Sequence, residues 1–242
     1  MKFLIGIDLG TSGTKTVLFN EEGTAVCSAT EEYPMYQPHN GWAEQNPADW
    51  WNACITTVNR VLSESNVNPA DIAGVGFSGQ MHGLVMLDGQ GEVIRNSIIW
   101  CDGRTAPECE EITERVGGSR LVEITANNAL TSFTAGNILW VRNHEPEIYK
   151  RCRHILLPKD YIRYKLTGRY GMEASDASGM NMLDIKTRVW SDEVLKRLEI
   201  DKELLPEVRE SYEIAGHISP EAAALTKLAE GTPVVYGSGD NE

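Results

Sequence analysis

The chain has 242 residues, with 35 Asp and Glu against 22 Lys and Arg and a formal net charge of -13. Its apolar and charged fractions are those of an ordinary globular protein, and its acidic balance argues against nucleic acid or an anionic membrane as a partner. No apolar run approaches the roughly 18 residues of a membrane span, and no leader pattern opens the chain, so we expect a cytoplasmic protein.

Two apolar runs, 3–9 and 14–19, form a predicted hairpin at the start of the chain. Asp8 ends the first run, and a carboxylate there is costly unless a cation such as Mg²⁺ meets it. The turn between the runs could direct backbone N–H groups, and the hydroxyls of Thr11, Ser12 and Thr14, at phosphate oxygens. The hairpin therefore predicts half of a nucleotide site, although an ordinary glycine-rich hairpin with a solvated Asp would have the same pattern.

Two familiar phosphate motifs are excluded. Only two residues separate Gly10 from Gly13, and Lys15 follows Thr14, so the turn is not a P-loop. Residues 74–79 spell a dinucleotide fingerprint, but no convincing helix follows and no acidic residue closes a second strand. We interpret that segment as a strand whose glycines allow a close approach.

A strand over 24–30 would complete a three-stranded antiparallel meander at the start of the chain. A helix should follow, with Asn46 as its N-cap, Pro47 at its first position and Asp49 in its first turn. Its apolar residues recur at helical spacing and predict a buried face. They are Trp50, Cys54, Val58, Val61 and Leu62, and the helix should break at 66–69.

The remaining elements alternate between strands and helices. Strands are expected over 72–77, 85–87, 98–100 and 232–236, and helices over 107–116, 135–143 and 158–165, with a peripheral helix pair in 191–209. This order predicts an α/β fold with a mixed sheet and a helical lobe inserted in or appended to one compact domain. The five cysteines contain no C-x-x-C pair, so we expect reduced thiols rather than disulfides or zinc; they are Cys27, Cys54, Cys101, Cys109 and Cys152.

A second acid, Asp240, follows a Gly-Ser-Gly turn at the end of the last strand. Together with Asp8 it would suit phosphoryl transfer, one acid holding a metal and the other accepting a proton. A third element is the 78–83 loop, where Gln80, Met81 and His82 offer the groups that bind a polyhydroxylated ligand. Alternatively, Asp240 is a solvated tail residue and His82 a loop histidine with a structural partner.

In combination these segments resemble the FGGY family of carbohydrate kinases, and within it the members that act on xylulose. The likeness covers essentially the whole chain. The segments that carry it are Gly6-Ile7-Asp8-Leu9-Gly10-Thr11-Ser12, Ser78-Gly79-Gln80-Met81-His82-Gly83, Trp100-Cys101-Asp102-Gly103-Arg104, Leu157-Pro158-Lys159-Asp160-Tyr161, Ser175-Asp176-Ala177-Ser178-Gly179 and Gly239-Asp240-Asn241.

The resemblance implies a ribonuclease-H-like (actin-like ATPase) domain that uses ATP and Mg²⁺ to phosphorylate the terminal hydroxyl of D-xylulose. It makes Asp240 the proton acceptor and Asp8 the acid near the metal, with both acids as metal ligands. It implies a sugar pocket built from Gln80, Met81, His82, Asp102, Arg104, Asp240 and Asn241, and a phosphate turn built from Gly10, Thr11, Ser12, Gly13, Thr14 and Lys15.

Two departures from the family stand out. Segment 131–137 lacks the Pro-Lys that such kinases commonly have after Phe-Thr-Ala, which leaves the sugar preference open. Family members are about twice as long, so residues 1–242 are expected to be the N-terminal sugar-binding domain without the nucleotide lobe, and inactive alone. The alternatives are a non-catalytic sugar-binding or regulatory module, or, less favoured, an actin-like assembly protein; a homodimer stays open.

Overall fold

A computed structural model describes residues 1–240 of the chain. Its main sheet is mixed and runs in the order β13-β14-β5-β1-β2-β3, with β15 also paired to β5. The strands are β1 (Phe3–Leu9), β2 (Gly13–Asn20), β3 (Ala25–Glu32), β5 (Ile72–Gly79), β13 (Ile214–His217), β14 (Pro233–Val235) and β15 (Ser238–Gly239). Strands β1 to β3 are antiparallel, which confirms the meander, whereas β5 is parallel to β1, β14 and β15.

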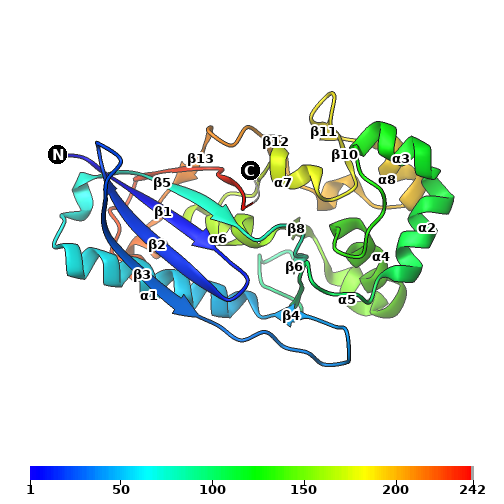
Figure 1. Cartoon of the computed structure of the whole chain (residues 1–242), viewed down its shortest axis with the longest axis horizontal. Helices are drawn as coiled ribbons and strands as arrows, with labels where there is room; N and C mark the ends of the chain where they lie inside the picture. The colour runs from blue at the N-terminus through cyan, green and yellow to red at the C-terminus, as the bar shows by residue number, and fades with distance from the viewer. Residues whose placement is uncertain (241–242) are drawn as a thin grey trace.

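Helix α1 (Pro47–Ser65) runs along the sheet and packs on β2 and β3 (Figure 1). It begins as predicted, because the side chain of Asn46 accepts the N–H of Ala48 at 3.0 Å. It ends at Asn66, which adopts the left-handed conformation with φ of 54°. Helices α6 (Pro158–Thr167) and α9 (Pro220–Thr226) pack beside α1, so one face of the sheet is covered.

The other end of the molecule is mainly helical, as Figure 1 shows. Its helices are α2 (Ala106–Val116), α3 (Gly118–Thr125), α4 (Thr134–His144), α5 (Pro146–Arg151), α7 (Ala174–Ser178) and α8 (Asp192–Leu198). Short strand pairs lie outside the main sheet. They are β4 (Glu44–Gln45) with β7 (Ser97–Ile98), β6 (Val85–Leu87) with β8 (His154–Leu156), β9 (Met172–Glu173) with β12 (Val208–Arg209), and β10 (Leu183–Asp184) with β11 (Val189–Trp190).

The β6–β8 ribbon separates two hydrophobic cores. Val85 and Leu87 pack into the core between the sheet and its helices, whereas Met86 packs into the core of the helical lobe. Because successive side chains of a strand point to opposite faces, one short strand contributes to both cores. The two cores thus share a wall, and the helical lobe is fixed against the sheet.

Several sequence predictions need correction. The strand expected over 98–100 is the two-residue β7, and Trp100 lies in the turn after it. The pair of helices expected in 191–209 is α8 followed by the 3-10 turn Lys202–Leu204 and strand β12. Another 3-10 turn, Pro69–Asp71, precedes β5. Helices α3, α5, α7 and α9 were not predicted.

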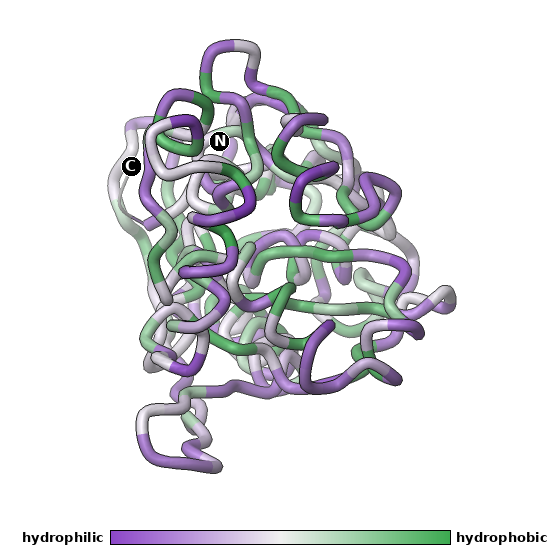
Figure 2. The backbone as a smooth tube through the Cα atoms, turned by 90° about the vertical axis from the view of Figure 1, so that its right-hand side faces the viewer, coloured by the Kyte–Doolittle hydropathy of each residue, from purple (hydrophilic) through white to green (hydrophobic). Residues whose placement is uncertain are grey.

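Hydrophobic residues run mainly through the interior, and the projecting loops are mostly hydrophilic (Figure 2). Within residues 1–240, no helix combines the length and the apolar character needed to cross a membrane. Cys27, Cys54, Cys101, Cys109 and Cys152 form no disulfide with one another.

Candidate functional site

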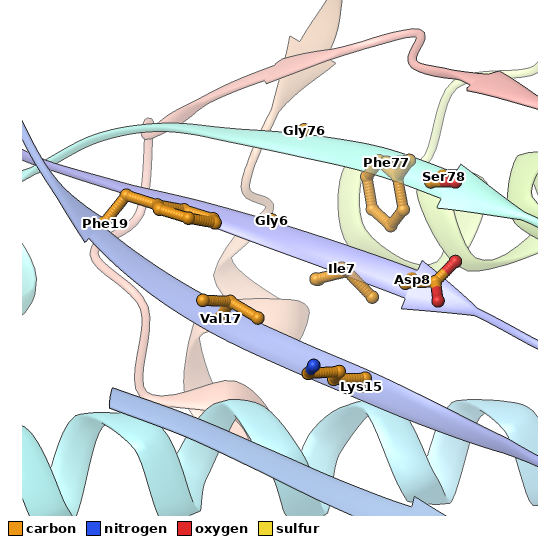
Figure 3. A pocket seen from close by; sticks show the side chains of 9 residues that line it. All are labelled: Gly6, Ile7, Asp8, Lys15, Val17, Phe19, Gly76, Phe77 and Ser78. Atoms are coloured by element: carbon orange, nitrogen blue, oxygen red, sulfur yellow. The ribbon is translucent and has the colours of Figure 1, made fainter. Parts of the chain in front are cut away.

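Three parallel strands end at the same edge of the sheet. Asp8 on β1 and Ser238 on β15 are both register partners of Ser78 on β5, and Figure 3 shows Asp8 beside Ser78 at this edge. The segments that follow these strands are the turn at 10–12, the loop at 80–83 and Asp240. The topology therefore brings together the three segments that the sequence singled out.

A cavity of about 250 Å³ opens at this edge. Four predicted residues line it: Thr11, Met81, His82 and Asp240. Two lining residues were not predicted, Trp100 and Ser132. Both belong to segments that stand out in the sequence, 100–104 and 131–137, but only the tertiary fold places them against the 80–83 loop. A volume of this size suits a small sugar rather than a nucleotide.

The turn after β1 is held through its carbonyl groups. The N–H of Gly10 donates to the carbonyl of Gly13 at 3.1 Å and closes the hairpin. The hydroxyl of Tyr33 donates to the carbonyl of Gly10, and the side-chain amide of Gln45 donates to that of Thr11 at 2.7 Å. These bonds fix the turn from the protein side.

The N–H groups of Thr11 and Ser12, by contrast, donate to nothing in the part of the chain that the structure describes. The carbonyl of Ser12 accepts the backbone N–H of Tyr33 at 3.3 Å, and the hydroxyl of Thr11 accepts the indole N–H of Trp100 at 2.9 Å. Successive unpaired N–H groups on a rigid turn are suited to bind an anion. The observation fits the predicted phosphate turn.

The other three predicted residues after the turn lie in β2 and differ in their surroundings. Thr14 is fully buried, because it shares a strand face with Thr16 on the side that α1 covers, so its hydroxyl is not exposed to a phosphate. Lys15 lies on the opposite face, beside its register partner Asp8. Position 13 requires glycine, because a Cβ there would lie 2.7 Å from the carbonyl oxygen of Glu31.

Gln80 does not line the cavity. It is 1% exposed, and its amide group donates to Oε1 of Gln45 at 2.9 Å. Oε1 of Gln45 also accepts the indole N–H of Trp50 at 3.1 Å. The side-chain N–H of the same Gln45 donates to the carbonyl of Thr11. Gln80 therefore supports the phosphate turn rather than contacting a sugar, which corrects the sequence expectation.

His82 is held in an unusual conformation. Its φ is +68°, in the left-handed region that non-glycine residues rarely adopt, and its carbonyl accepts the Thr134 hydroxyl at 3.0 Å. Its Nδ1 lies 3.1 Å from the carbonyl oxygen of Gly179, and its ring packs edge-on against Phe133 at a centroid distance of 4.7 Å. Burial lowers the pKa of the imidazole, which the bond to Gly179 only partly offsets, and this favours the neutral ring.

Asp240 is anchored by its N–H, which donates to the carbonyl of Gly79 at 3.0 Å. Burial, followed by the charge of Asp8, raises the pKa of the Asp240 carboxyl. Gly239 is needed beside it, because a Cβ there would lie 2.8 Å from the side chain of Met81. Asn241, predicted to bind sugar, lies outside the described residues.

The two acids fit a Mg²⁺ ion that phosphates help to hold. No group of three or more His, Cys, Asp or Glu side chains that could bind a metal occurs within residues 1–240. Mg²⁺ characteristically takes one or two carboxylates and completes its shell with waters and substrate phosphates. The exposed carboxylate of Asp8, close enough to Asp240 to affect its pKa, matches such a donor set.

Asp102 and Arg104 lie behind the cavity rather than in it. Their side chains are almost completely buried and form an ion pair at 2.7 Å, and Arg104 also pairs with Glu44 at 2.9 Å. The guanidinium lies 3.7 Å from the ring centroid of Trp42, and a carboxylate oxygen of Asp102 accepts the N–H of Ala43. Both residues were expected at the sugar pocket; they do not line the cavity but lie buried beneath the segment of Trp100, a position from which they can support its wall.

The face of the sheet opposite α1 carries a shallow groove of about 380 Å³ (Figure 3). Val17, Phe19 and Phe77 form its apolar walls, and Gly6 and Gly76 form its floor, while Asp8 and Lys15 stand at one end. The groove includes Asp8 but neither Asp240 nor any residue of the 80–83 loop, so we assign the candidate site to the smaller cavity.

Comparisons with known proteins show the family of the chain. Residues 3–242 match the family model described as the FGGY family of carbohydrate kinases, N-terminal domain. The xylulose kinase of Bacillus subtilis is 44% identical over 241 residues, an alignment that covers 100% of this chain and 48% of that protein. Thus the chain spans about half the length of the curated relatives it matches.

Solved structures show the same fold. The crystal structure of xylulose kinase from Rhodospirillum rubrum superposes with a TM-score of 0.95 at 27% identity, covering 99% of this chain and 49% of that one. A gluconate kinase from Lactobacillus acidophilus superposes with a TM-score of 0.92 at 28% identity, covering 99% and 48%. Backbone similarity at this level is thus shared by proteins named for different sugars.

Proposed function

The chain belongs to the FGGY family of carbohydrate kinases, and we propose that it forms the sugar-binding part of an enzyme that uses ATP to phosphorylate a ketopentose, converting D-xylulose to D-xylulose 5-phosphate. The observation that carries the proposal is the cavity of about 250 Å³ that places His82, Met81 and Asp240 beside Thr11 of the phosphate turn. The identity to a xylulose kinase supports the choice of sugar.

In the proposed reaction, His82 and the wall formed by Met81 and Trp100 hold the sugar with its terminal hydroxyl toward Asp240. The raised pKa of Asp240 suits a general base that accepts the proton of the attacking hydroxyl. The unpaired N–H groups of Thr11 and Ser12 bind phosphate oxygens of ATP. Asp8 would help to hold a Mg²⁺ ion, which would neutralise charge on the phosphates.

A cytoplasmic location, where ATP and reduced thiols occur together, completes the proposal. Sedimentation of the purified chain would decide whether it forms a homodimer.

The test is a chimera in which residues 1–242 replace the matching half of the Bacillus subtilis xylulose kinase. We expect the chimera to phosphorylate D-xylulose in the presence of ATP and Mg²⁺, with formation of the sugar phosphate followed by phosphorus NMR. A chimera that folds and binds D-xylulose but does not turn it over would favour the alternative, a non-catalytic sugar-binding module.

A further inference from the structure

Five charged side chains lie completely buried beneath the candidate site. Lys159, Asp160 and Arg163 come from α6, and Glu173 and Asp176 come from β9 and α7. They comprise two cations and three carboxylates. Burying charges costs free energy, and replacing a buried ion pair with apolar residues is often neutral or stabilising. Stability alone is therefore a weak explanation for this cluster.

Lys159 is the centre of the cluster. Its ammonium lies 3.2 Å from Asp160, 3.2 Å from Glu173 and 3.0 Å from Asp176. Burial alone would lower the pKa of this ammonium, but the three carboxylates outweigh it and raise the pKa. Lys159 thus remains charged and joins α6 to the segment around α7.

The beginning of α6 supports the 80–83 loop from below. A Cβ on Gly79 would lie 3.2 Å from Cβ of Lys159, and a Cβ on Gly83 would lie 2.6 Å from the ring of Pro158. The glycines on both sides of Met81 and His82 are therefore in contact with the first turn of α6.

The end of α7 supports the same loop from the side. Its C-cap residue, Gly179, is in contact with the ring of His82, because a Cβ there would lie 2.3 Å from Cε1. Glu173 caps the start of α7 by accepting the N–H groups of Ser175 and Asp176 at 2.7 and 2.9 Å. Asp176 has no such capping role, and Lys159 is its partner within residues 1–240.

We propose that Asp176 is a positioning residue for His82: its ion pair with Lys159 holds α7 against α6, so that the Gly179 carbonyl fixes the imidazole with the proton on Nδ1. Only the predicted effect on sugar affinity rests on the proposed function. The arrangement of the ring can be measured without any ligand.

Asp160 provides a matched control. Both Asp160 and Asp176 are buried and both contact Lys159, so replacing either one with Leu leaves two cations and two carboxylates. Asp160 lies next to Lys159 on α6, however, and makes no connection to α7. Asp176→Leu therefore removes the ion pair between α7 and α6, whereas Asp160→Leu leaves it in place.

The test is nitrogen NMR of the His82 ring in the purified chain at about pH 8, because burial raises the pKa of Asp176 to about 7 and its carboxyl is largely ionised above that value. In the native chain and in Asp160→Leu we expect one tautomer with the proton on Nδ1. In Asp176→Leu we expect a mixture of tautomers and a His82 pKa that rises toward that of an exposed imidazole. Removing the negative charge of Asp176 would by itself lower the pKa of His82. A rise in that pKa therefore reports displacement of the ring.

Sugar affinity supplies the functional readout. Calorimetry with D-xylulose should show roughly tenfold weaker binding for Asp176→Leu and little change for Asp160→Leu, and Asp176→Asn, which keeps an oxygen for Lys159, should recover part of the loss. If the native chain does not bind D-xylulose, the proposed function fails, while the His82 spectrum still decides the positioning role.

A native-like His82 spectrum in a folded Asp176→Leu variant would overturn the inference, as would equal changes in both variants. If Asp176→Leu does not fold, the double variant Lys159→Met/Asp176→Leu removes one charge of each sign and keeps apolar packing. The inference then requires a disturbed His82 spectrum in that variant, and a native spectrum would refute it.

Discussion

Nδ1 of His82 lies 3.1 Å from the carbonyl oxygen of Gly179, a residue 97 positions away in the chain. A carbonyl oxygen only accepts hydrogen bonds, so this contact places the proton of the neutral ring on Nδ1. Nε2 is then an acceptor, and a sugar hydroxyl can donate to it. The relationship links a distant glycine to the chemistry of the cavity.

The first prediction concerns this acceptor. His82→Ala should weaken binding of D-xylulose to the chain by about 1 to 3 kcal/mol, because a sugar hydroxyl loses its buried partner. Calorimetry measures the change, and His217→Ala, on the exposed part of β13, serves as the control. Equal affinities of the two variants would assign His82 a purely structural role.

The second prediction concerns Gly179. In Gly179→Ala the new Cβ would lie 2.3 Å from Cε1 of His82, so the ring must move. We expect sugar binding to weaken by about as much as in His82→Ala. Gly118→Ala is a suitable control, since its Cβ would meet Thr113 at an ordinary 3.5 Å. Native affinity in Gly179→Ala would show that the ring position does not matter.

The third prediction concerns Asp240. In the chimera described above, Asp240→Asn should leave sugar affinity nearly unchanged and lower the phosphorylation rate about 10² to 10⁴-fold, or roughly 3 to 5 kcal/mol of barrier, because the proton acceptor is lost. Rates from phosphorus NMR and affinities from calorimetry separate the two effects. A rate within a few-fold of that of the unaltered chimera would exclude Asp240 as the base.

The fourth prediction concerns pH and stability. Burial, together with Asp160 and Glu173, outweighs Lys159 and raises the pKa of Asp176 to about 7. Below that value the folded chain holds a proton that an unfolded Asp would release, so the stability contributed by Asp176 falls as pH rises from about 5 to about 7. Asp176→Asn should therefore gain stability relative to the native chain, on the order of 1 kcal/mol per pH unit.

Urea unfolding of the native chain and of Asp176→Asn across this range measures the difference. Glu147→Gln, which alters an exposed ion pair with Lys150, should give a profile parallel to that of the native chain. Parallel profiles for Asp176→Asn as well would show that Asp176 does not titrate in this range.

Local signals made much of the fold predictable. Asn46, Pro47 and the break after Ser65 delimit α1 because capping depends on neighbouring residues. Helix α7 has only five residues, too few to show a helical period in the sequence, and its position depends on the contact between Asp176 and Lys159 of α6. A contact between segments that far apart in the chain leaves no periodic signal, so α7 was missed.

In the site, too, local patterns could be predicted from the sequence, whereas contacts between distant segments could not. Gln80 was assigned to the sugar because its partner Gln45, 35 positions away, could not be seen in the sequence. The burial of Thr14 was readable, since alternate residues of β2 share the covered face. Trp100 and Ser132 reach the cavity only through the packing of the helical lobe against the sheet.

The most direct test of the account is calorimetric titration of the purified 242-residue chain with D-xylulose, alongside gluconate and glycerol. We expect saturable binding of one D-xylulose per chain, weaker or absent heats with the other two compounds, and loss of the signal in His82→Ala. A folded chain that gives no heat with D-xylulose, or that binds all three compounds equally, would contradict the claim that this cavity is a ketopentose site.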